Sequence, residues 1–205
     1  MNAFVMNLIH RVDRWDKMKS HFGNLNLIRV DGEIGTDLKS KVKALGLSHM
    51  KLIKECLEKG MQTVLILEDD CIPEPGWFSR WTSIKEYLDN NLDEWDVFNG
   101  CIHSLWDKKY VRKIEDTTLL TGTMGGASHW VYLNLNAYDK FMSWKDEDID
   151  LFYNDGKKFK VLGCYPFIAI QSEGYSDLMA TERKWNYFKD RMEYSMYLQN
   201  YHIVE

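Results

Sequence analysis

The chain has 205 residues, of which 45% are hydrophobic and 14% aromatic, and this is enough for one domain with a substantial core. A formal net charge of −5 argues against a nucleic-acid-binding protein, because such proteins usually carry a basic excess. The N-terminus lacks the pattern of a signal peptide, and no apolar run approaches the length of a bilayer span. We therefore expect a soluble, cytoplasmic protein. Its four cysteines form no Cys-x-x-Cys pair and are expected to be reduced thiols, not zinc ligands.

The first half of the chain alternates predicted strands and helices. Strands are expected at 3–9, 26–30, 64–67 and 95–99, and helices at 12–22, 48–60 and 77–88. Ser48 is expected to cap the start of the second helix, and Gly60 lies where that helix should stop. Residues 64–67 are apolar without alternation, which is typical of a strand buried on both faces. This order predicts an α/β fold with a mixed, mostly parallel central sheet flanked by helices.

The second half has a less regular pattern. Short strands are expected between 108 and 133, helices at 136–143 and 149–157, and strands at 159–163 and 166–171. The tail from about 181 to 201 is predicted to be an aromatic amphipathic helix. Gly122, Gly125 and Gly126 indicate either a flexible loop that closes over a ligand or a plain turn.

An acidic triplet, Glu68-Asp69-Asp70, directly follows the apolar run at 64–67. In open α/β sheets, ligands bind beyond the carboxyl ends of the strands. Side chains alternate along a strand, so Glu68 and Asp70 should point the same way, where their charges repel unless a cation compensates. Mn²⁺ and Mg²⁺ are hard cations that bridge carboxylates to phosphate. The triplet therefore predicts a metal site at Glu68 and Asp70, with a solvated acidic turn as the alternative.

Three sequence blocks carry a resemblance to a known family. They are residues 7–15 (Asn-Leu-Ile-His-Arg-Val-Asp-Arg-Trp), 46–49 (Gly-Leu-Ser-His) and 64–71 (Val-Leu-Ile-Leu-Glu-Asp-Asp-Cys). Their order and spacing resemble those of glycosyltransferase family 25, the group of bacterial lipooligosaccharide galactosyltransferases and collagen galactosyltransferases. Further along, 130–132, 148–152 and 171–177 are similar to later segments of that family.

The resemblance implies a GT-A type fold and a metal-dependent glycosyltransferase. Such an enzyme moves a hexose from a UDP-sugar to a hydroxyl group of a glycan, glycoprotein or glycolipid acceptor, with Mn²⁺ or Mg²⁺ as cofactor. The chain would then be one domain, 1–205, with a nucleotide-sugar-binding half at 1–100, an acceptor-facing half at 101–180 and a C-terminal helix at 181–205. No nucleic acid or membrane span is expected.

Together with the chemistry of the side chains, the resemblance also suggests residue roles. Glu68 and Asp70 are expected to bind the metal. Asn7, Leu8 and Asp31 are expected to contact the nucleobase of the donor, and Arg11 and Arg14 its pyrophosphate. Ser48 and His49, at a predicted helix N-terminus, and Asp69 complete the expected nucleotide-sugar site. For Arg11 and Arg14 the alternative is a solvated basic turn paired with Asp13, and for His49 it is a packed core histidine.

A general base is expected to take the proton of the acceptor hydroxyl, and the candidates are Asp150 and Asp148. Acidic residues that simply open a helix are the alternative interpretation of this segment. For the whole chain, two other functions stay open: a metal-dependent phosphoester enzyme, and a non-catalytic carbohydrate- or nucleotide-binding protein with a transferase-like fold.

Overall fold

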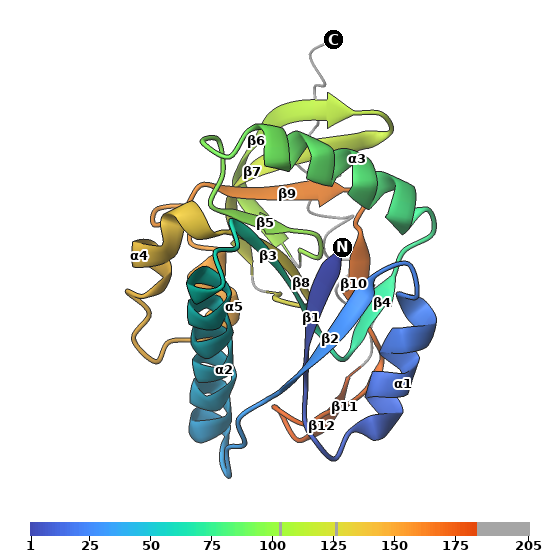
Figure 1. The fold of residues 1–205 in the computed structure, drawn as a ribbon, viewed down its shortest axis with the longest axis vertical. Helices are drawn as coiled ribbons and strands as arrows, with labels where there is room; N and C mark the ends of the chain where they lie inside the picture. Colours follow the sequence, from blue (N-terminus) through green and yellow to red (C-terminus); the bar gives the residue numbers. More distant parts are fainter. Residues whose placement is uncertain (103, 126, 184–205) are drawn as a thin grey trace.

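The computed structural model describes residues 1–102, 104–125 and 127–183 (Figure 1). The first half contains β1 (Asn2–Asn7), α1 (Val12–His21), β2 (Asn26–Asp31), α2 (Leu38–Glu58), β3 (Thr63–Glu68), β4 (Cys71–Pro73), α3 (Trp77–Asn90) and β5 (Val97–Asn99). The second half contains β6 (Ser104–Ile114), β7 (Thr117–Gly125), β8 (Trp130–Asn134), a 3₁₀ turn (Leu135–Ala137), α4 (Tyr138–Phe141), α5 (Ile149–Tyr153), β9 (Val161–Tyr165), β10 (Ala169–Gln171), β11 (Gly174–Ser176) and β12 (Thr181–Arg183).

The described strands build one large mixed sheet with the order β2-β1-β3-β8-β5-β9-β7-β6. Strands β2, β1, β3, β5, β9 and β6 run in one direction, and β8 and β7 run in the other. The predicted α/β fold with a mixed, mostly parallel sheet is therefore confirmed. Strand β8 lies between β3 and β5 and is antiparallel to both, so it starts beside the carboxyl end of β3 and runs toward its amino end.

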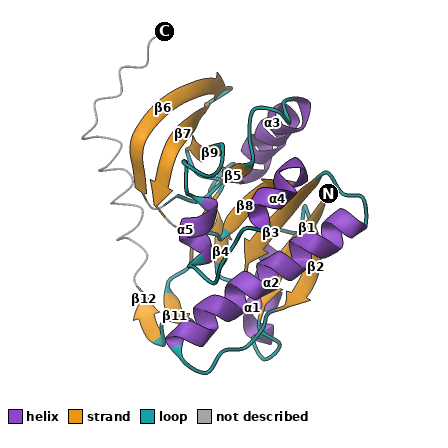
Figure 2. Ribbon diagram, turned by 90° about the vertical axis from the view of Figure 1, so that its left-hand side faces the viewer, coloured by secondary structure: helices purple, strands orange, loops and turns teal. Residues whose placement is uncertain are grey.

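Apolar side chains cover both faces of the sheet, and β3 shows how. Val64 and Ile66 pack into a core shared with α2, α4 and α5, whereas Leu65 and Leu67 pack into a second core shared with α1 and α3. Figure 2 shows α2 lying across the sheet on the first of these faces. The unbroken apolar run of β3 thus follows from its burial on both faces. Within the described ranges, no helix combines the length and apolarity that a membrane span requires.

Helix α2 is longer than predicted, and its start is the main local correction. It begins at Leu38, and Asp37 caps it by accepting a hydrogen bond from the Ser40 amide at 3.0 Å. Ser48 therefore lies in the middle of the helix and caps nothing, so the predicted helix start at 48 is wrong. The first turns of α2 contain three lysines, but Leu38, Val42 and Leu45 recur there at helical spacing, a pattern that the prediction did not use.

Three differences concern the second half. The short strands expected between 108 and 133 include one long antiparallel hairpin, β6–β7. Gly122 and Gly125 lie within β7, so the predicted loop is a strand at these two positions, and Gly126 lies outside the described residues. The predicted tail helix begins as a strand, β12, and its part from 184 onward also lies outside the described residues.

A close contact between α2 and the loop before α5 depends on a glycine. A Cβ atom at the buried Gly46 would overlap the indole ring of Trp144. We expect Gly46→Ala to destabilise the fold by about 1–2 kcal/mol, because the overlap outweighs the gain of about 1 kcal/mol that alanine brings to a helix interior. Urea unfolding checks this, with Gly23→Ala as control, since a Cβ there meets only ordinary contacts. Equal free energies of unfolding for Gly46→Ala and wild type would contradict the packing argument.

Candidate functional site

A cavity of about 500 Å³ opens where β1 and β3 end at their carboxyl edge. This size suits a small-molecule ligand. One wall is polar and carries the acidic triplet. The other wall is aliphatic and comes from the segment before α2, the first turns of α2 and residues 178–179.

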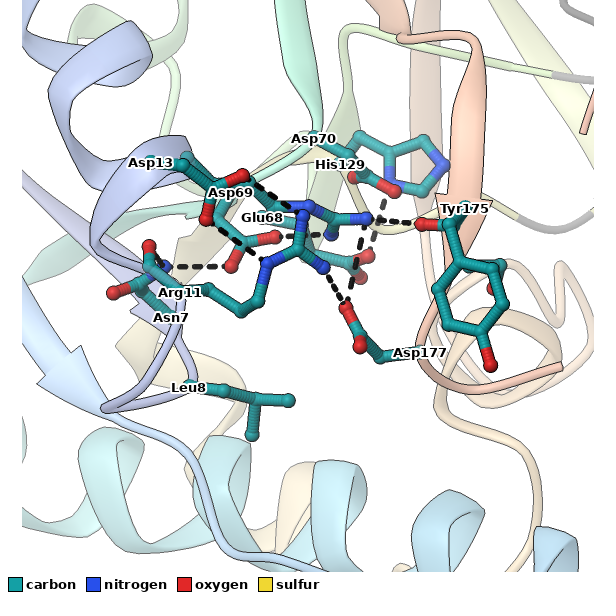
Figure 3. A network of polar contacts seen from close by, with 12 residues as sticks. Asn7, Leu8, Arg11, Asp13, Glu68, Asp69, Asp70, His129, Tyr175 and Asp177 are labelled. Atoms are coloured by element: carbon teal, nitrogen blue, oxygen red, sulfur yellow. Dashed lines mark hydrogen bonds and ion pairs between the residues drawn. The ribbon is translucent and has the colours of Figure 1, made fainter. Parts of the chain in front are cut away.

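Glu68 and Asp70 converge on one side of this cavity, as their positions predicted. His129 Nδ1 lies 2.9 Å from Glu68 Oε2 and 3.2 Å from Asp70 Oδ1. Each of the three residues offers one ligand atom, and these atoms all lie within 4.8 Å of one another. Figure 3 shows Asp70 and His129 side by side above Glu68. The triplet is thus part of a potential metal site whose third ligand the sequence prediction did not include.

The pairing of β3 with β8 explains why His129 lies here. Leu67 is the register partner of Trp130, so the residues just beyond, Glu68 and His129, are neighbours across the antiparallel pair. The Glu68 amide donates to the His129 carbonyl at 3.2 Å, and Ser128 Oγ donates to the Glu68 carboxylate. The signal in the sequence was the Ser-His dipeptide just before the apolar run at 130–133, but its use requires knowing that this strand pairs with β3.

Electrostatics couples the three groups. Burial disfavours the charged form of His129, but the carboxylates of Asp70 and Glu68 outweigh it and raise the His129 pKa well above its ordinary value. Burial likewise disfavours ionised Glu68 and Asp70, yet the charge of His129 keeps the pKa of both below the ordinary range. At neutral pH the cluster therefore holds an imidazolium between two carboxylates.

Asp69 turns away from the metal cluster and bonds to the first block of the sequence. Its two carboxylate oxygens accept hydrogen bonds from Asn7 Nδ2 and from Arg14 Nη1, each at 2.7 Å. Asn7 also donates to the carbonyl of Arg11 at 3.0 Å, so it fixes the turn between β1 and α1. Asn7, Leu8 and Arg14 all line the cavity, and Arg14 places a guanidinium next to the acidic wall.

Asp150 lies on the cavity wall at the start of α5 and is partly buried. Burial, followed by the charge of Glu68, raises the pKa of Asp150 to about 7. Its Oδ1 is a buried atom without a hydrogen-bond partner among the described residues. Asp148 also lines the cavity, but its carboxylate accepts the Asp150 amide at 2.9 Å and caps α5. The two candidate bases therefore have different environments.

Ser48 and His49 have protein partners that argue against their predicted role. Ser48 does line the cavity, but its hydroxyl donates to the Ala44 carbonyl at 2.8 Å and accepts the Glu33 amide at 2.9 Å. His49 is buried against the Tyr153 hydroxyl at 3.0 Å, and burial lowers its pKa to about 4, so it is a neutral core histidine. The interpretation of both residues as a phosphate site at a helix N-terminus is wrong, because the helix starts ten residues earlier.

Asp31 and Arg11 do not line the cavity, and both contact charged side chains. Asp31 ends β2, is exposed, and lies 3.4 Å from Arg29 Nε. Arg11 bonds to Asp13 at 3.0 and 3.1 Å, which is the pairing that the alternative interpretation described, and it also contacts Asp177. Gln171 and Asp177 were not predicted as site residues, yet both line the cavity.

Comparison with known proteins gives little. No family model matches the sequence, and no curated protein matches it. Among solved structures, the chain is similar to A197 from STIV, with a TM-score of 0.46 and 12% identity, covering 90% of this chain and 93% of that one. It is also similar to a glycosyltransferase involved in the glycosylation of the major capsid of PBCV-1, with a TM-score of 0.43 and 11% identity, covering 69% of this chain and 63% of that one. With both TM-scores below 0.5, the functional argument rests on the site itself.

Proposed function

We propose that this chain is a metal-dependent glycosyltransferase of the GT-A, family 25-like type that moves a hexose from a UDP-sugar to a hydroxyl group of a glycan, glycoprotein or glycolipid acceptor. The observation that carries the proposal is the convergence of Glu68, Asp70 and His129 on one wall of the cavity. The resemblance adds support, because each of its three blocks contributes lining residues: Asn7, Leu8, His10 and Arg14 from the first, Ser48 from the second, and Glu68 to Asp70 from the third.

The donor set fits a divalent cation. Two carboxylate oxygens and one imidazole nitrogen within 4.8 Å suit Mn²⁺, which accepts both ligand types, better than Mg²⁺, which prefers oxygen. When bound, the cation would neutralise the leaving nucleoside diphosphate as a Lewis acid. His129 has to lose its Nδ1 proton to become a ligand, so metal affinity should rise with pH. Gln171 Nε2 donates to Asp70 Oδ2 at 3.0 Å and orients this ligand.

The diphosphate needs positive charge beside the metal ligands, and Arg14 supplies it. The guanidinium is already oriented by Asp69 at 2.7 Å and lines the cavity. A planar guanidinium matches phosphate oxygens in a fork, which gives direction as well as charge.

Asp150 is the proposed general base. It is partly buried, its Oδ1 has no hydrogen-bond partner in the described part of the chain, and its pKa of about 7 places it where proton transfer at neutral pH is efficient. Asp148 positions the helix turn that carries it.

Thermal melting with nucleotides tests the donor site. We expect UDP in the presence of Mn²⁺ to raise the melting temperature, since a ligand at a hundred times its Kd adds about 2.7 kcal/mol to folded-state stability. GDP, and UDP with a chelator, should give much smaller shifts. Equal shifts of the melting temperature with and without Mn²⁺ would contradict the proposal.

A screen of UDP-sugars for metal-dependent hydrolysis then separates the three functions. A transferase releases UDP, a phosphoester enzyme releases UMP, and a binding protein releases neither.

A further inference from the structure

Three basic side chains from separate parts of the chain converge on one short segment. Arg11 Nη1 donates to Asp177 Oδ2, and Arg14 Nη2 lies 3.6 Å from the same oxygen. Lys41 Nζ, from the first turns of α2, donates to the Asp177 carbonyl at 2.7 Å. Figure 3 shows the Asp177 carboxylate directed at the guanidinium groups. Asp177 thus contacts basic side chains from three elements: the β1–α1 turn, α1 and α2.

This cluster forms part of the proposed donor cavity. Arg14, Lys41 and Asp177 all line it, and Arg14 also bonds to Asp69, next to the metal ligand Asp70. The side chains of Arg11, Arg14 and Asp177 are 19%, 14% and 27% exposed, so the cluster is partly shielded from water and open to a ligand. A guanidinium binds carboxylate and phosphate oxygens with the same geometry. Asp177 therefore occupies a position that a phosphate group would fit.

Polar contacts join the segment that carries Asp177 to the body of the protein. Strands β11 and β12 pair only with each other among the described strands, apart from the large sheet. The segment follows Gln171, which binds Asp70, and the Ser172 amide donates to the Asp70 carbonyl at 2.7 Å. Arg14 Nη2 also donates to the Tyr175 carbonyl. A ligand that takes over the arginines would remove the main ionic contacts that hold Asp177 in place.

We propose that Arg11, Arg14 and Lys41 form the diphosphate subsite, and that Asp177 fills it as an internal substitute for a phosphate until the donor binds. The inference rests on the proposed function and adds Lys41 and the displacement of Asp177 to it. A phosphate entering while Asp177 stays would face a like charge, whereas after Asp177 moves away it meets three cations. The apparent affinity for phosphate is accordingly reduced by the fraction of molecules in which Asp177 occupies the subsite.

Binding of inorganic pyrophosphate to the full chain without added metal, measured by titration calorimetry, tests this. Asp177→Asn removes the competing charge, and we expect it to lower the Kd by about fivefold. Lys41→Gln should raise the Kd in both wild-type and Asp177→Asn backgrounds. Glu173→Gln removes the same charge from an exposed position four residues away and serves as the matched control, with an unchanged Kd expected.

An Asp177→Asn Kd that equals or exceeds the wild-type value would overturn the inference, as would an equal gain in Glu173→Gln, because the effect would then be one of overall charge. Absence of pyrophosphate binding in both wild type and Asp177→Asn would overturn the subsite itself. These results are independent of sugar transfer. If Asp177→Asn tightens pyrophosphate binding but no UDP-sugar is hydrolysed with Mn²⁺, the proposed function fails while the anion subsite stands.

Discussion

Asp70→Asn is expected to reduce metal-dependent hydrolysis or transfer of a UDP-sugar by about 10³-fold, the largest loss that we predict for a single substitution. Asp70 belongs to the potential metal site together with Glu68 and His129, and an amide oxygen is a much weaker ligand for Mn²⁺ than a carboxylate. The substitution keeps the size of the side chain, and the Asp70 carbonyl still accepts the Ser172 amide. The loss should therefore be one of metal affinity and turnover, not of folding.

Two measurements separate these effects. Steady-state rates over a range of Mn²⁺ concentrations should show a raised metal requirement in Asp70→Asn, and melting without ligand should show a folded protein. Glu86→Gln removes one negative charge from an exposed position on α3 and is expected to behave as wild type. Turnover by Asp70→Asn within about tenfold of wild type at the same Mn²⁺ concentration would argue against Asp70 as a metal ligand.

The parts of the site that could be predicted are those that local pattern determines. The apolar run before Glu68 has no alternation, so a strand buried on both faces followed by a ligand site at its carboxyl end could be inferred from residues 64–70 alone. The side chains of Glu68 and Asp70 converge because each lies on the same side of the chain, two residues apart. No knowledge of the rest of the fold was needed for this step.

The parts that were missed depend on strand order. His129 reaches Glu68 only because β8 inserts between β3 and β5 in the antiparallel direction, and no local pattern in residues 128–134 reports that neighbour. Asp177 meets Arg11 across 166 residues of chain for a similar reason. The error at Ser48 has another cause: Ser48 is a residue type that caps helices, but the apolar spacing of Leu38, Val42 and Leu45 already extends the helix back to its true cap, Asp37.

Asp150→Asn is expected to lower kcat by about 10²- to 10⁴-fold while leaving the binding of UDP and Mn²⁺ within a few-fold of wild type. The amide cannot take a proton from the acceptor hydroxyl, but the contacts of His129 with Glu68 and Asp70, and of Arg14 with Asp69, do not involve Asp150. The same substitution at Asp148 distinguishes the two candidates, because asparagine also caps helices and should keep α5 in place. A larger loss in Asp148→Asn than in Asp150→Asn would reverse the assignment.

Asp150 should also leave opposite signatures in activity and stability. As a base it must be ionised, so kcat/KM should fall as pH drops below about 7, and bound Mn²⁺ should move this limb to lower pH by opposing the charge of Glu68. Stability has the reverse dependence, because the pKa of Asp150 is higher in the folded protein than in the unfolded chain. Between about pH 4 and 7 the folded protein keeps a proton on Asp150 that the unfolded chain has lost. The free energy of unfolding therefore declines as the pH rises through that window. Without metal, the melting temperature of Asp150→Asn should therefore gain on wild type from pH 4 to 7 and keep its advantage above. Higher stability together with lower activity in Asp150→Asn would show that the Asp150 carboxylate destabilises the fold and is needed for catalysis. A carboxylate with a purely structural role would instead lower the stability of the protein when it is replaced.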